Sequence, residues 1–113
     1  MTRFFDGLAT LVGAVFLLGG TTKLAAAPMH LESFARWGLP TWFMVVVGLV
    51  EVVVAILMFT PRARLYGAVL AVATLLGAMA NLIRAGELSS IAVPLVVLIL
   101  SAFVGLRVRA ETT

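Results

Sequence analysis

Four long apolar segments, separated by short polar connections, dominate this sequence of 113 residues. They cover residues 5–27, 40–59, 65–83 and 91–107, to within a few positions. Each has close to the roughly 20 residues that a helix needs to cross the hydrocarbon core of a bilayer. Helices and closed barrels satisfy their backbone hydrogen bonds in lipid, and these continuous apolar runs lack the alternation of barrel strands. We therefore predict a single membrane domain over residues 1–113 with four transmembrane helices.

The connections between the segments indicate how the helices are arranged. Residues 60–64 and 84–90 form short links, so the helices that they join should pack antiparallel. The longest connection, residues 28–40, carries large apolar side chains at every third position: Leu31, Phe34 and Trp37. This spacing predicts a short amphipathic helix on the bilayer surface. The expected fold class is all-α, an integral membrane antiparallel four-helix bundle with a short interfacial helix between the first two membrane helices.

Composition supports the membrane assignment and excludes several other classes of protein. Hydrophobic residues make up 63% of the chain and charged residues 12%, whereas a soluble domain has roughly 45–50% and about 25%. The net charge of +3 does not indicate nucleic acid binding, because the Lys and Arg residues are scattered at segment ends and form no basic stripe. The absence of cysteine excludes disulfides, thiol redox chemistry and thiolate-bound metals within the chain.

The distribution of Lys and Arg predicts the orientation of the chain in its membrane. Five of them lie on the side that holds both termini and the connection 60–64, and three lie on the opposite side. The positive-inside rule therefore places both termini in the cytoplasm. Arg3, the first apolar run and Ala25-Ala26-Ala27 also imitate a cleaved secretory signal. Because Pro28 would follow the cut directly and the run is long enough to span the membrane, we interpret it as a retained first helix.

Glu51 most needs an explanation, because it lies near the middle of the second apolar segment. An ionisable side chain at such a depth is costly and marks a functional candidate. At helical spacing Glu51, Lys23 and Asn81 each share a helix face with Gly and Ala residues, which line helix contacts in membranes. We therefore predict that these three residues form a polar centre inside the bundle.

The depths of these residues leave their pairing open. Lys23 and Asn81 lie near the outer ends of their segments, whereas Glu51 is about eleven residues, roughly 16 Å, below Pro40. A Lys23–Glu51 ion pair requires Lys23 to reach inward, and without that pair Glu51 should be protonated. The centre either locks the register of the helices or lines a site for a small lipophilic molecule or a proton.

Other polar residues are assigned to the membrane interface. His30, Arg36, Trp37 and Arg84 are candidate interfacial contacts, and we expect His30 to be solvated. Because His30 is the one histidine of the chain, it cannot form a bis-histidine metal or haem site within a single copy. No nucleotide-binding loop, catalytic triad or zinc signature occurs, so the sequence assigns neither a catalytic residue nor a metal site.

The polar residues stand in longer runs that are distinctive in combination. These runs are Gly19-Gly20-Thr-Thr-Lys23-Leu24, Phe34-Ala-Arg-Trp-Gly-Leu-Pro-Thr-Trp-Phe43 with His30 before it, Gly48-Leu-Val-Glu51, Pro61-Arg-Ala-Arg64 and Gly77-Ala-Met-Ala-Asn81-Leu-Ile-Arg84-Ala-Gly-Glu87. Over nearly the whole chain they resemble the DoxX-like family of small four-helix membrane proteins. Lys23 and Glu51 match the Lys and Glu positions of that family, whereas Asn81 stands where relatives often carry His.

The resemblance implies a bacterial inner-membrane protein of an oxidoreductase system. Related members are subunits of thiosulfate:quinone oxidoreductase or of membrane-associated oxidoreductase complexes. Our leading hypothesis is a small subunit or quinone-proximal adaptor that holds no cofactor of its own, takes quinone as ligand and meets an oxidoreductase partner protein. The alternatives are a proton-coupled transporter or lipid-binding module, for which a homo-oligomer would be needed, and a structural interaction protein without chemistry.

Overall fold

The computed structural model describes residues 2–112 and is all-helical over that range. Four helices are long and apolar enough to cross a membrane: α1 (Thr2–Leu24), α3 (Thr41–Phe59), α4 (Arg64–Arg84) and α5 (Ala92–Thr112). The short helix α2 (Pro28–Arg36) joins α1 to α3, and the 3-10 turns η1 (Pro61–Ala63) and η2 (Leu88–Ser90) precede α4 and α5. The all-α class and the four membrane-spanning candidates are thus confirmed.

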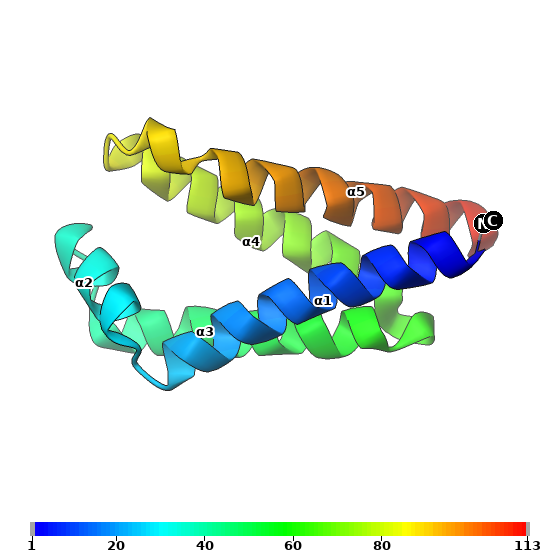
Figure 1. The fold of residues 1–113 in the computed structure, drawn as a ribbon, viewed down its shortest axis with the longest axis horizontal. Coiled ribbons are helices and arrows are strands. Elements are labelled where there is room, and N and C mark those ends of the chain that lie inside the picture. Colours follow the sequence, from blue (N-terminus) through cyan, green and yellow to red (C-terminus); the bar gives the residue numbers. More distant parts are fainter. Residues whose placement is uncertain (1, 113) are drawn as a thin grey trace.

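The long helices are arranged as two pairs (Figure 1). Helix α1 lies along α3, α4 lies along α5, and α3 also contacts α4. The first and last described residues lie at one end of the molecule, and α2 lies at the other end, where the two pairs stand apart. The buried apolar cluster belongs mainly to the half near the termini, with Val12, Met58, Ala71 and Val104 among its members. The half near α2 is the less tightly packed one.

Helix α1 ends three residues before the expected limit at residue 27 because the backbone reverses at Ala26. Ala26 has a φ of 55°, in the left-handed region. The Ala27 amide donates to the Thr22 carbonyl and the Ala26 amide to the Lys23 carbonyl, both at 3.0 Å. This is the hydrogen-bond pattern of a Schellman C-cap. Pro28 then starts α2, since a proline lacks the N–H that the first turn of a helix does not use.

Two glycines follow the ends of helices α2 and α4. Gly38 and Gly86 both have a φ of 74°, which glycine adopts without steric cost. The Leu39 amide donates to the Phe34 carbonyl and the Glu87 amide to the Leu82 carbonyl, each at 2.8 Å, which closes α2 and α4 by the same cap as α1. The tight reversal after Gly86 fixes the backbone of Glu87 beside the end of α4.

Helices α1 and α3 approach closely through small residues. A Cβ added to Gly20 would lie 2.8 Å from the Gly48 carbonyl oxygen, and one added to Gly48 would lie 3.1 Å from the Gly20 carbonyl oxygen. Such contacts let two helix backbones meet in a membrane. They set the last turn of α1 against the middle of α3, so that the first turns of α3 extend beyond the end of α1.

The end near the termini is fixed by a buried arginine. Arg64 Nε donates to the Met58 carbonyl at 2.8 Å, and Arg64 Nη1 lies 2.8 Å from Asp6 Oδ1. The guanidinium therefore satisfies a carbonyl in the last turn of α3 and pairs with a carboxylate of α1. Arg64 is the first residue of α4, so one side chain connects three helices.

Candidate functional site

Lys23 and Glu51 form an ion pair between α1 and α3. Lys23 Nζ lies 2.7 Å from Glu51 Oε1, and the two side chains are 15% and 12% exposed. The contact is short but poorly aligned, because the buried Oε1 has no hydrogen-bond partner of good geometry. The register of α1 and α3 explains how Lys23 reaches Glu51. Since α1 stops at Leu24, Lys23 lies beside Gly48 rather than beside the start of α3.

Gly19 makes room for the Glu51 carboxylate. A Cβ at Gly19 would lie 2.6 Å from Glu51 Oε2 and 3.8 Å from Lys23 Nζ, so a larger residue would displace the carboxylate. A buried pair of this kind adds little net stability, but removing one partner leaves an uncompensated charge and costs about 3–5 kcal/mol. Lys23 and Glu51 therefore depend on each other, and the glycines at the end of α1 allow them to meet.

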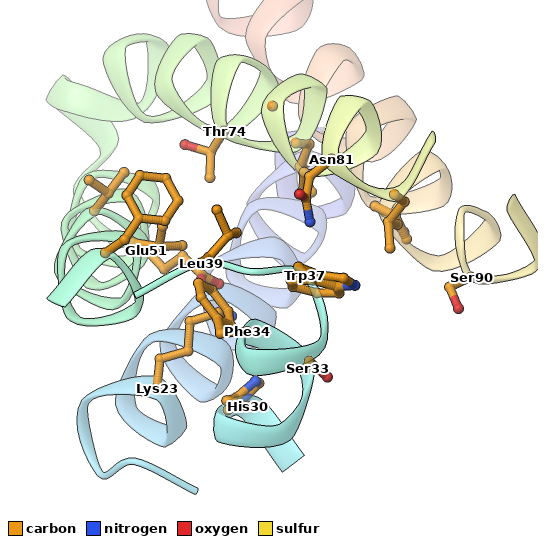
Figure 2. A pocket seen from close by; sticks show the side chains of 18 of the residues that line it. Lys23, His30, Ser33, Phe34, Trp37, Leu39, Glu51, Thr74, Asn81 and Ser90 are labelled. Atoms are coloured by element: carbon orange, nitrogen blue, oxygen red, sulfur yellow. The ribbon is translucent and has the colours of Figure 1, made fainter. Parts of the chain in front are cut away.

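A cavity of about 890 Å³ opens beside this ion pair (Figure 2). It lies between the α1–α3 pair and the α4–α5 pair, and residues of α2 and of the following connection line its end. Most lining side chains are apolar or aromatic, including Phe16, Phe34 and Val97. Of the polar ones, Lys23, His30 and Ser33 lie on or near α2. A pocket of this size and composition can enclose a small lipophilic molecule and orient it by a few polar groups.

A second polar cluster, here called the Glu87 clasp, consists of Arg36, Trp37, Arg84 and Glu87. Arg36 Nε and Nη2 donate to the two Glu87 oxygens at 3.0 and 2.9 Å, and Trp37 Nε1 donates to Glu87 Oε2 at 2.7 Å. Arg84 Nη2 donates to the Trp37 carbonyl at 2.9 Å. The clasp connects the end of α2 to the end of α4, about 50 residues apart in sequence.

The clasp changes the ionisation of its members. The hydrogen bonds from Arg36 and then from Trp37 lower the pKa of Glu87 below its ordinary value. The same contact with Glu87 raises the pKa of Arg36. Both groups are therefore charged over the physiological pH range, and their attraction holds α2 near the α4–α5 connection.

The family comparison decides what kind of membrane protein this is. The model of the DoxX-like family matches residues 7–104, which is most of the chain. The chain belongs to the DoxX-like family. No curated protein and no solved structure matches it. With its four apolar helices, this DoxX-like protein is a multi-pass membrane protein whose helices contact the lipid bilayer.

Asn81 of this DoxX-like protein lines the same cavity but does not join the ion pair directly. Its Oδ1 accepts a hydrogen bond from Arg84 Nη2 at 2.7 Å, which links it to the Glu87 clasp. The side-chain amide lies across the cavity from Glu51, beside Trp37 (Figure 2). Of the three residues predicted as a polar centre, two are in contact and the third stands on the opposite wall.

His30 lies deeper than the sequence suggested. It lines the cavity and is only partly exposed, and its Nε2 lies 2.8 Å from Thr22 Oγ1. Burial, and secondarily the charge of Lys23, lowers the pKa of His30, so the ring is neutral at pH 7. His30 was expected to be solvated because the position of α2 at the end of the cavity cannot be predicted from the local spacing of residues. Among residues 2–112, no three acidic or histidine side chains gather as metal ligands.

Proposed function

We propose that this DoxX-like protein is a small inner-membrane subunit that binds a quinone-type molecule beside a partner oxidoreductase. The observation that carries this proposal is the cavity of about 890 Å³ among the membrane-spanning helices, with the Lys23–Glu51 ion pair in its wall. A quinone combines an apolar body with polar ring oxygens, which fits apolar walls that carry a few polar groups at one end.

The charge balance of the cavity favours an uncharged ligand. The charged residues that line it are Lys23, Arg36, Glu51 and Glu87, and they form two ion pairs. A ligand with a net charge would find no unpaired counter-charge among these groups and would pay desolvation on entry. A neutral ring oxygen can instead accept a hydrogen bond from Lys23, which has N–H groups left after its contact with Glu51.

The proposal also includes an oxidoreductase partner protein and an orientation of the helices in the membrane. The chain has no cysteine and so no thiol couple of its own, and we assign electron transfer to an oxidoreductase partner. In this arrangement the helices form an antiparallel bundle with both termini in the cytoplasm, and α2 lies at the opposite bilayer surface. Helix α2 has the sequence for such a position, with Leu31 and Met29 exposed and polar residues between them.

Mass spectrometry of lipophilic molecules that co-purify in mild detergent tests the proposal. Glu51→Gln leaves Lys23 as an unpaired buried charge, so we expect quinone retention to fall by about tenfold or more. Glu32→Gln is the matched control, because Glu32 is an exposed carboxylate of α2 outside the cavity wall. Unchanged retention in Glu51→Gln, with helical content intact, would count decisively against the assignment.

A further inference from the structure

The Thr22 hydroxyl determines which nitrogen of His30 carries the proton. Thr22 Oγ1 lies 2.7 Å from the Leu18 carbonyl oxygen and 3.0 Å from the Gly19 carbonyl oxygen, so its single proton is donated to the helix backbone. The same Oγ1 lies 2.8 Å from His30 Nε2 and must act as the acceptor there. His30 therefore carries its proton on Nε2, and Nδ1 is left as an acceptor.

Glu51 supplies a second unused acceptor in the same cavity wall. An ionised carboxylate offers about four lone-pair sites, and Lys23 is the one polar partner of Glu51 among the residues that the structure describes. Lys23 in turn keeps two N–H groups beyond that contact. Lys23, His30 and Glu51 all line the cavity near α2 (Figure 2). This end of the cavity thus combines one donor group with two acceptor groups.

An aromatic hydroxyl matches that combination better than a carbonyl does. Its oxygen accepts from Lys23 while its proton is donated to His30 or Glu51. A quinone carbonyl or an ether oxygen can only accept, so it leaves His30 Nδ1 and the remaining acceptor sites of Glu51 without a donor after water is displaced from an apolar cavity. A site built to pair with a ligand hydroxyl discriminates strongly against an analogue that lacks it.

We propose that the cavity selects the reduced, hydroxyl-bearing form of its ring ligand, a quinol or phenol, with His30 Nδ1 and the Glu51 carboxylate as the acceptors that determine this specificity. This inference rests on the proposed function and adds to it the redox form of the ligand. It concerns binding alone, and the partner oxidoreductase would receive the ligand in this reduced form.

A pair of redox-inactive probes tests the selection. para-Heptylphenol and its methyl ether, para-heptylanisole, differ at a single oxygen, so their affinities compare a hydroxyl with an oxygen that only accepts. We expect the purified protein in detergent to bind the phenol about tenfold or more tightly than the ether, measured by titration calorimetry. His30→Phe keeps a planar ring but removes one of the two acceptors and should weaken the preference, whereas His30→Asn, with an acceptor oxygen near the Nδ1 position, should retain it.

The possible outcomes separate this inference from the proposed function. Equal affinities of the wild-type protein for the two probes overturn the inference and leave quinone-type binding in place, whereas failure to bind either probe or any quinone overturns both. NMR of the histidine ring nitrogens gives a readout that needs no ligand, and His30 is the sole histidine of the chain. The Nε2–H form is expected, and an Nδ1–H form would overturn the inference.

Discussion

At the scale of single residues, two adjacent glycines decide whether Lys23 and Glu51 can meet. A methyl group at Gly19 would meet the flexible end of Glu51, whereas one at Gly20 would meet the Gly48 carbonyl in the backbone of α3. A carboxylate can rotate away, but two helix backbones must separate together. Replacing Gly19 or Gly20 by a larger residue should therefore have different effects on the protein.

Gly20→Ala should lower the stability of the protein in detergent by about 1–3 kcal/mol, because it overpacks the α1–α3 contact. Gly19→Ala should displace the Glu51 carboxylate from Lys23 and weaken quinone retention. Gly7→Ala is the control, because that position faces open space and the change removes a flexible residue from a helix. Thermal unfolding followed by circular dichroism compares the stability of the Gly20→Ala protein with that of the Gly7→Ala protein. A Gly20→Ala protein as stable as Gly7→Ala would show that the close contact is not needed.

The residue types of the polar centre could be read from the sequence, but their distances could not. Glu51 and Lys23 stand out because charges are rare in apolar segments. Whether they touch depends on where α1 ends, and α1 stops at Leu24 because the backbone reverses at Ala26, an alanine in a conformation that usually requires glycine. Without a glycine to mark that turn, the expected limit was residue 27. Three residues of helix correspond to about 4.5 Å along the axis, which is enough to hide the pairing.

At the scale of elements, α2 is held over one end of the cavity by the Glu87 clasp. Contacts from Arg36 and Trp37 converge on the single carboxylate of Glu87. The spacing of Leu31, Phe34 and Trp37 indicated a short helix in this segment, and α2 is that helix. The sequence offered no sign of its partner, because Glu87 follows α4 and a local pattern does not show which distant loop a helix reaches.

The clasp should loosen in acid. The pKa of Glu87 is lowered by its hydrogen bonds from Arg36 and Trp37. The stabilisation that the ionised Glu87 carboxylate gives to the clasp is therefore fully present above the ordinary pKa of a glutamate, about 4.3. It is lost as the pH falls through the lowered pKa of Glu87 in the folded protein. With Trp42→Phe as background, Trp37 is the remaining tryptophan, and its fluorescence should change over that acidic range.

Glu87→Gln in the same background is the control for this titration. A glutamine cannot titrate, so the acid-dependent change in Trp37 fluorescence should disappear while the spectrum at neutral pH shifts toward the acid form. An identical titration in the two proteins would assign the change to another carboxylate and would remove Glu87 from its role in holding α2.

At the scale of the whole molecule, the four spans could be predicted and their division into two pairs could not. Span length and apolar composition follow directly from the bilayer, and all four candidates are found. In a membrane, however, a lipid-facing Leu and a helix-facing Leu look alike in the sequence, because lipid is as apolar as a protein core. The separation of the α1–α3 and α4–α5 pairs, and hence the cavity between them, is a property of the packed chain.

Filling the cavity without touching its polar residues tests most directly whether it holds a lipophilic ligand. Gly77 lines the cavity and has open space around it, so Gly77→Phe should place a ring in the cavity without a clash. Quinone retained through purification should then fall by about tenfold or more, while Gly7→Phe, at another open position outside the cavity, should retain the wild-type amount. Full retention in a folded Gly77→Phe protein would show that the ligand does not bind in this cavity.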